Sequence, residues 1–190
     1  MEKRILVTYA VPQELVEIKW SGVACFYLQT GIGKMRSAHY LTEAITGFNP
    51  DVVVNIGTSG SIQHKVGDVF FCTQFIDRDI DRVKCLGLSS RVDTSITLMD
   101  KGVAQSWVNE GTCNTGDSFV TADTDLAGDV IDMEAFVQAW ICEKKGIPFV
   151  SIKYVTDIIG KNSVKLWEEK LNAAKHGLDK YINHIIKGLY

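Results

Sequence analysis

Carboxylates at three places in the chain are the side chains best suited to acid–base chemistry. Glu14 follows a short apolar segment, Asp132 and Glu134 stand two residues apart, and Asp157 comes after the apolar segment 148–155. Ligands of α/β proteins gather beyond the carboxyl ends of the strands, so Asp157 is a candidate acid. Asp132 and Glu134 could grip the paired hydroxyls of a sugar.

Each of these carboxylates also has a structural interpretation. Acidic residues in a first helical turn complement the helix dipole, and taken alone Glu14, Asp132 and Glu134 favour that interpretation. Asp157 could equally cap the turn that follows it. Single residues therefore do not decide between catalysis and structure.

The elements that must position these residues follow from apolar periodicity. Apolar residues three and four positions apart from Met133 to Ile141 predict a helix with Asp132 and Glu134 at its N-terminal mouth. Two lysines, Gly146 and Pro148 predict its end. A second amphipathic helix is predicted from about Ser163 to Ile185, covering one side of the sheet and carrying no chemistry.

Two glycine segments connect predicted elements. Residues 31–34 lie between a predicted strand, 23–29, and a helical pattern, and match neither phosphate-binding fingerprint, which favours a tight structural turn. Residues 57–61 follow the continuous apolar strand 52–56, which is of the kind buried on both faces. This second segment lacks the glycine of a serine-hydrolase elbow at Ser61, but as a loop beyond a strand it is a candidate for ligand contact. Phe119, beside another glycine turn, could belong to the core or stack on a base.

Composition bounds the class of protein. The net charge of −3 gives no basic footprint for nucleic acid, and no apolar run approaches a membrane span. The five cysteines form no C-x-x-C pair, which predicts free thiols in a reducing compartment. No histidine has a metal or triad spacing. Without a recognisable signal peptide, we expect a cytoplasmic protein. Strands alternate with helices and no linker interrupts them, which predicts a single α/β domain over residues 1–190.

Taken together, the motifs are more specific than any one of them. The set comprises Ala10-x-x-x-Glu14, Gly31-Ile32-Gly33-Lys34, Asn55-x-Gly57-Thr58-x-Gly60, Gly116-Asp117-x-Phe119, Asp132-Met133-Glu134-Ala135 and Thr156-Asp157. In this order they resemble the 5′-methylthioadenosine/S-adenosylhomocysteine nucleosidases of the nucleoside phosphorylase superfamily.

The resemblance implies a fold and a reaction. The fold is a three-layer α/β/α sandwich with a mixed central sheet, commonly a homodimer. The reaction is hydrolysis of the N-glycosidic bond of a purine nucleoside, without a metal or organic cofactor.

The resemblance also implies site roles. Glu14 is the water-activating base and Asp157 protonates the purine at N7, which requires burial that raises its pKa. Glu134 holds the ribose hydroxyls. The remaining predicted contacts are Met133 beside the sugar, Phe119 stacked on the base, Val120 reading the purine edge through its backbone, Thr58 in place of a serine usual in the family, and Gly60 against the base.

Departures from the family pattern leave alternatives open. Lys153 stands where an arginine is usual, Asp132 is shorter than the usual glutamate, and the chain is shortened between Asp68 and Asp117. The 5′ substituent is the part of the substrate least well indicated, and a futalosine hydrolase is the runner-up. A phosphorylase is less favoured because residues 57–61 contain no arginine, although Arg36 lies near a glycine loop. A non-catalytic nucleoside-binding module is the alternative from a different class.

Overall fold

The computed structural model describes residues 2–103, 110–121, 126–160, 163–186 and 188–189. Its strands are β1 (Lys3–Tyr9), β2 (Val23–Gln29), β3 (Val52–Ser61), β4 (Val69–Asp77), β5 (Arg91–Asp93), β6 (Glu110–Thr115), β7 (Val130–Asp132) and β8 (Phe149–Ile158). The α-helices are α1 (Lys34–Phe48), α2 (Arg78–Asp81), α3 (Ser95–Asp100), α4 (Ala135–Lys145) and α5 (Ser163–Lys180). Short 3₁₀ turns η1 (Pro12–Glu14) and η2 (Lys84–Leu86) and a π-helical end, η3 (Tyr181–Ile186), complete the described elements.

The described strands form one mixed sheet in the order β2-β1-β3-β7-β6-β4-β5. Strand β8 pairs in parallel with β3 and antiparallel with β4, and β7 pairs with both β3 and β6. The pairings therefore form a closed ring of strands in the order β3, β8, β4, β6 and β7. Strand β1 pairs in parallel with β3 outside this ring, and β2 pairs in parallel with β1.

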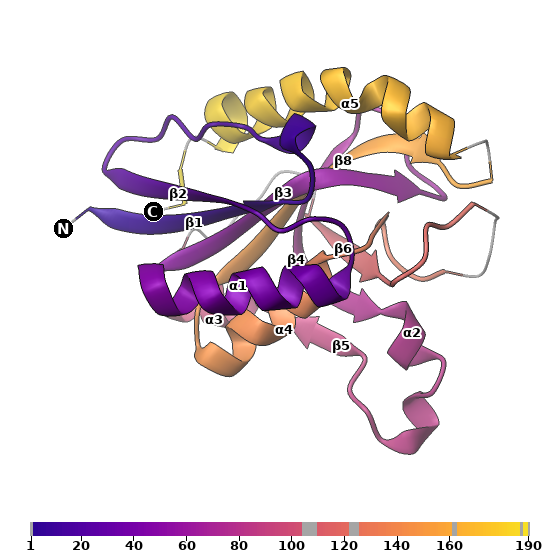
Figure 1. Cartoon of the computed structure of the whole chain (residues 1–190), viewed down its shortest axis with the longest axis horizontal. Helices are drawn as coiled ribbons and strands as arrows, with labels where there is room; N and C mark the ends of the chain where they lie inside the picture. Colours follow the sequence, from indigo (N-terminus) through magenta and orange to yellow (C-terminus); the bar gives the residue numbers. More distant parts are fainter. Residues whose placement is uncertain (1, 104–109, 122–125, 161–162, 187, 190) are drawn as a thin grey trace.

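Helices cover both sides of the sheet, as Figure 1 shows: α5 on one side and α1 with α4 on the other. Alternating residues of β1 feed two separate cores, because successive side chains of a strand point to opposite faces. Ile5 and Val7 pack in the core under α5, whereas Leu6 packs in the core with α1 and α4. The expected α/β/α layering with a mixed sheet is confirmed, as is the burial of strand 52–56 on both faces.

Two boundaries differ from expectation. Residues 57–61, expected as a loop, continue strand β3, because they pair with β8 to its end. The helix expected to include Met133 begins only at Ala135, since residues 130–132 pair with β6 as strand β7. Its predicted end is confirmed: Gly146 adopts a left-handed conformation with φ of 64° and closes the last turn of α4.

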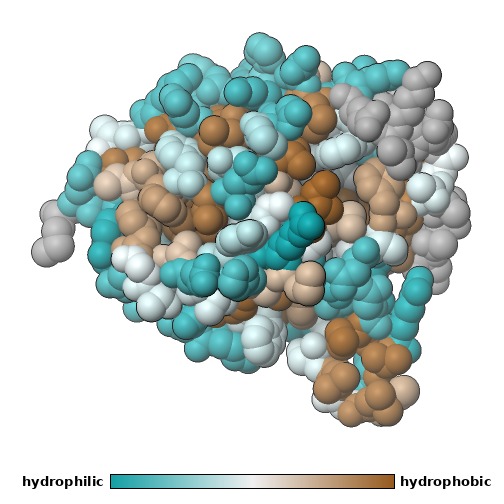
Figure 2. All heavy atoms as spheres, viewed as in Figure 1, coloured by the Kyte–Doolittle hydropathy of each residue, from teal (hydrophilic) through white to brown (hydrophobic). Residues whose placement is uncertain are grey.

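A projecting lobe follows α2, and Figure 2 shows hydrophobic residues gathered on it. Val83, Leu86 and Leu88 are 39%, 72% and 51% exposed there. We refer to residues 83–88 as the apolar lobe. Within the described ranges, none of the helices has the length and apolar character needed to span a bilayer. All five cysteines are free thiols, as predicted.

Candidate active site

Glu14 is buried and held by four hydrogen bonds. The turn η1 directs its carboxylate back toward β3, where Oε1 accepts from the backbone N–H of Thr58 at 2.7 Å and from its hydroxyl at 2.6 Å. Oε2 accepts from the backbone N–H groups of Ala10 and Val11, each at 3.1 Å. A carboxylate offers about four lone-pair positions, so this one is fully satisfied and rigidly oriented.

A buried ion pair lies at the centre of the site. The Lys153 ammonium is 2.8 Å from Asp132 Oδ2, and both side chains are almost fully buried. Burial alone would lower the pKa of Lys153, but the neighbouring Asp132 charge raises it well above the ordinary range. Conversely, burial would raise the pKa of Asp132, and Lys153 lowers it. Both partners are therefore charged, and Lys153 neutralises the carboxylate two residues before Glu134.

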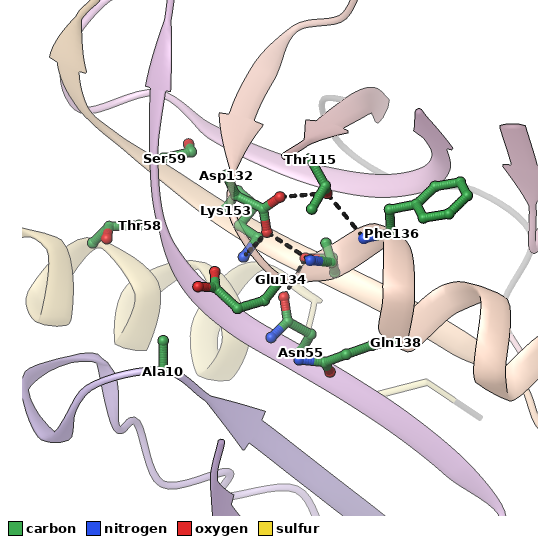
Figure 3. A network of polar contacts seen from close by, with 12 residues as sticks. Ala10, Asn55, Thr58, Ser59, Thr115, Asp132, Glu134, Phe136, Gln138 and Lys153 are labelled. Carbon is green, nitrogen blue, oxygen red and sulfur yellow. Dashed lines mark hydrogen bonds and ion pairs between the residues drawn. The ribbon is translucent and has the colours of Figure 1, made fainter. Parts of the chain in front are cut away.

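Asp132 also organises the start of α4. Its Oδ1 accepts from the Thr115 hydroxyl at 2.5 Å and its Oδ2 from the N–H of Ala135 at 2.8 Å, while Thr115 Oγ1 accepts from the N–H of Phe136. Figure 3 shows Asp132 at the junction of these contacts. The structural interpretation of Asp132 is thus supported, although it acts from β7 and not from within the helix.

Glu134 points away from this cap, toward the side of the site where Ala10 and Thr58 lie (Figure 3). Its Oε1 accepts from the backbone N–H of Gly33 at 2.8 Å. Burial, and then the Asp132 charge, raises the pKa of Glu134 to about 8. The protonated form of Glu134 is therefore favoured at neutral pH.

Asp157 lies within β8 and is 2% exposed. Its Oδ1 accepts from the Thr156 hydroxyl at 2.9 Å. Gly60 is its neighbour on β3, and a Cβ there would lie 3.0 Å from Asp157 Oδ2 and 2.6 Å from Ile159 Cδ1. A side chain at position 60 would therefore require Ile159 or Asp157 to shift.

An aromatic pair lies in the wall of the pocket. Phe119 is 39% exposed, so it is not a core residue. Its ring meets Trp167 of α5 edge-on, with centroids 6.4 Å apart. The C-terminal helix, which was expected to carry no chemistry, contributes Trp167 to the pocket lining, and the Trp167 indole N–H donates to Thr58 Oγ1 at 2.8 Å. Its place in the amphipathic repeat concealed this, because the same spacing predicts a core residue.

Arg78 is a second residue that sequence reasoning missed. The mixed charges around it predict a solvated surface, yet it is 5% exposed. Its guanidinium donates to the carbonyl oxygens of Asn114 at 3.1 Å, Asp132 at 3.0 Å and Ser118 at 2.6 Å. It therefore clamps the segment before Phe119 to the segment before Glu134, and a side chain at Gly116 would overlap it.

The glycine turn at residues 31–34 is structural, as predicted, but it also supports the site. Besides the Gly33 contact with Glu134, the Lys34 ammonium lies 3.1 Å from Asp77, 2.9 Å from Asp79 and 3.4 Å from Asp117. The backbone N–H of Lys34 donates to Asp117 as well. Carboxylates of the protein itself thus occupy the N-terminus of α1.

One pocket brings all of the predicted site residues together. Its lining comprises Ala10, Val11, Glu14, Ile32, Thr58, Ser59, Gly60, Arg78, Ser118, Phe119, Val120, Ile131, Asp132, Met133, Glu134, Asp157, Ile159 and Trp167. Arg36 is exposed, packs against Gly31 and is not part of this lining.

The chain matches known proteins over most of its length. A family model described as the phosphorylase superfamily covers residues 7–187. The 5′-methylthioadenosine/S-adenosylhomocysteine nucleosidase of Marinomonas sp. (strain MWYL1) is 30% identical over 193 residues, which cover 90% of this chain and 84% of that protein. The nucleosidase of the same name from Bacillus velezensis is 31% identical over 196 residues, with the same two coverages.

Solved structures share the fold. The 5′-methylthioadenosine/S-adenosylhomocysteine nucleosidase of Colwellia psychrerythraea 34H, in complex with adenine, has a TM-score of 0.79 at 23% identity and covers 100% of this chain and 97% of its own. The futalosine hydrolase of Helicobacter pylori strain 26695 has a TM-score of 0.78 at 16% identity and covers 96% of each chain. The chain therefore belongs to the phosphorylase superfamily and is similar to its 5′-methylthioadenosine/S-adenosylhomocysteine nucleosidases.

Proposed function

We propose that this protein hydrolyses the N-glycosidic bond of a 5′-substituted purine nucleoside of the methylthioadenosine or S-adenosylhomocysteine type. The observation that carries the proposal is the convergence of three buried carboxylates, Glu14, Glu134 and Asp157, on one pocket that has an exposed aromatic ring, Phe119, in its wall. Asp157 would protonate the purine at N7, and Glu14 would accept a proton from the attacking water.

The proposed reaction needs Glu14 and Asp157 on opposite sides of the sugar. Cleavage gives the sugar oxocarbenium character and leaves negative charge on the base, so an acid must serve the base and a base must serve the water. A Cβ at Gly57 would lie 3.3 Å from Glu14 Oε1, and one at Gly60 would lie 3.0 Å from Asp157 Oδ2. These two glycines are three residues apart on β3, so the two carboxylates approach this strand at different points along it.

Glu134 is suited to the sugar between them. Its pKa of about 8 means that the neutral carboxyl can donate a hydrogen bond to a ribose hydroxyl in the ground state. Positive charge that develops on the sugar would strengthen the contact between Glu134 and the ribose hydroxyls in the transition state. Met133 would pack beside the sugar, and Thr58, Gly60 and Val120 would contribute the remaining contacts.

Several contacts favour water over phosphate as the nucleophile. Phosphate sites use arginines and helix N-termini. Here the pocket's arginine, Arg78, is engaged by backbone carbonyls, and the N-terminus of α1 is occupied by Glu134 and Asp117. The Asp117 carboxylate would repel phosphate from the glycine turn.

The decisive experiment measures base release from 5′-methylthioadenosine by chromatography, with and without phosphate. Adenine and free methylthioribose without phosphate are the expected products. A sugar 1-phosphate formed only with phosphate would instead make the protein a phosphorylase. In parallel, Asp157→Asn should lose base release while keeping its fold and its affinity for the nucleoside. If the wild type released the base and Asp157→Asn released it as well, Asp157 could not be the acid.

Futalosine is the alternative substrate, because a futalosine hydrolase shares the fold as closely as the nucleosidases do. Running futalosine, S-adenosylhomocysteine and inosine beside methylthioadenosine separates these possibilities. Release from futalosine alone would keep the chemistry and change the 5′ group. Binding without release from any of them would support the non-catalytic module.

We also propose that the protein is a cytoplasmic homodimer. The free thiols suit a reducing compartment, and the apolar lobe exposes Leu86 and Leu88 in a way that a second copy could cover. Light scattering at working concentration should give twice the chain mass, and a monomer mass would reject the dimer.

A further inference from the structure

A chain of two hydrogen bonds leads from α5 to Glu14. The Trp167 indole N–H donates to Thr58 Oγ1 at 2.8 Å, and the Thr58 hydroxyl donates to Glu14 Oε1 at 2.6 Å. The other side of the same indole meets the ring of Phe119. We propose that Trp167 is a positioning residue for Glu14: it orients the Thr58 hydroxyl and couples the purine side of the pocket to the water side. This inference rests on the proposed function.

The chemistry of the two donors determines the direction of each hydrogen bond in this series. An indole N–H can only donate, and a hydroxyl has a single hydrogen. Because Thr58 Oγ1 accepts from Trp167, its own hydrogen is left for Glu14. A phenylalanine at position 167 would keep an aromatic ring but would leave the hydroxyl free to rotate. The indole nitrogen is thus the specific element, and not the bulk of the side chain.

Thr58 supplies the one adjustable contact of Glu14. The other three donors to this carboxylate are backbone N–H groups of Ala10, Val11 and Thr58, which the fold fixes. Side-chain rotation could change only the hydroxyl contact without moving the main chain. Trp167 therefore acts on the one contact of Glu14 that depends on side-chain orientation.

The contact with Phe119 connects this device to the base. Phe119 is partly exposed in the pocket wall, where we propose that the purine stacks. A purine that fixes the Phe119 ring would also fix the edge of Trp167 against it. The hydroxyl beside Glu14 would then be oriented most firmly when substrate is bound.

The test compares Trp167→Phe with Thr58→Val and the double variant in steady-state base release. Loss of a hydrogen bond that acts on a charged group corresponds to a decrease in kcat of about 10- to 100-fold, with KM within about twofold. In the Thr58→Val background the Trp167 substitution should change kcat by less than about twofold. The reason is that the effects of two substitutions in the same series of hydrogen bonds are not additive. Trp140→Phe, at an exposed position on α4, is the matched control and should keep wild-type kinetics.

A spectroscopic readout keeps the proposal testable if Trp167→Phe folds poorly. In protein with ¹⁵N-labelled tryptophan, the Trp167 indole N–H resonance should move in Thr58→Val and in Glu14→Gln but stay in place in Trp140→Phe. An unmoved resonance, or wild-type kcat in folded Trp167→Phe, would overturn the role of Trp167 and leave the nucleosidase proposal standing. Absence of base release by the wild type would instead overturn the proposed function, and this inference with it.

Discussion

Glu134 should make the stability of the protein depend on pH, and the substitution Glu134→Gln should remove this dependence. Burial and the neighbouring Asp132 raise its pKa from an ordinary value of 4.5 to about 8 in the folded chain. The folded protein thus binds this proton more tightly than the unfolded chain does. The stabilising contribution is complete below pH 4.5 and is lost as the pH rises through 8.

The magnitude follows from linkage. Between pH 5 and pH 9, a group with these two pKa values reduces the free energy of unfolding by about 4 kcal/mol. Glu134→Gln keeps an amide oxygen that can accept from Gly33 but does not titrate. The free energy of unfolding of the variant, minus that of the wild type, should therefore rise by about 4 kcal/mol between pH 5 and pH 9. The same variant should lose activity, because the amide cannot replace the carboxyl group in the hydrogen bonds proposed to hold the ribose hydroxyls.

Urea denaturation at intervals between pH 5 and pH 9 measures this difference. Tryptophan fluorescence can report unfolding, and the m-values of the two proteins should agree. Glu43→Gln is the control, since the Glu43 side chain is 68% exposed on α1; its difference from the wild type should be flat. A flat difference for Glu134→Gln as well would refute the assignment of the raised pKa to Glu134.

Other substitutions test the remaining parts of the site. Lys153→Met should destabilise the protein by about 3–5 kcal/mol at pH 7 in urea, because it leaves Asp132 charged and buried, and adding Asp132→Asn should recover most of the loss. Gly116→Ala should raise the KM for the nucleoside by about tenfold through its overlap with Arg78, and should have little further effect once Arg78→Ala has made room; equal effects in both backgrounds would contradict the clamp. Glu14→Gln should lower turnover by about 10²- to 10⁴-fold with nucleoside affinity nearly unchanged, and undiminished turnover would remove Glu14 from the mechanism.

The sequence predicted the layers of the fold because its strongest patterns are local. The continuous apolar run at 52–56 and the helix stop at Gly146 each follow from neighbouring residues alone. The extension of β3 through residues 57–61 does not, since polar and glycine residues there are held in the sheet by pairing with β8. The same holds for β7, whose three residues form a strand because β6 and β3 flank them.

Within the site, sequence motifs indicated the residues expected to contact the substrate. The residues that hold them in place depend on tertiary contacts, which no local motif indicates. Trp167 and Arg78 contact the pocket from elements whose local patterns indicate packing and solvent exposure. Lys153 departs from the family's usual residue, so a motif could only leave its role open. The structure places its ammonium on Asp132, which is itself shorter than the glutamate usual at that position.

These two departures belong together. The length of a carboxylate and the length of its cationic partner must suit each other when both are buried, because an unpaired charge there is costly. Asp132 uses its oxygens on Lys153, Thr115 and the start of α4, and none of its contacts is with Glu14. The proximity of its charge contributes to the raised pKa of Glu134. Burial is the larger cause of that shift, and within the pair Asp132 raises the pKa of Glu134 whereas Lys153 lowers it. The buried pair would therefore adjust the protonation state of the carboxyl that we propose binds the sugar.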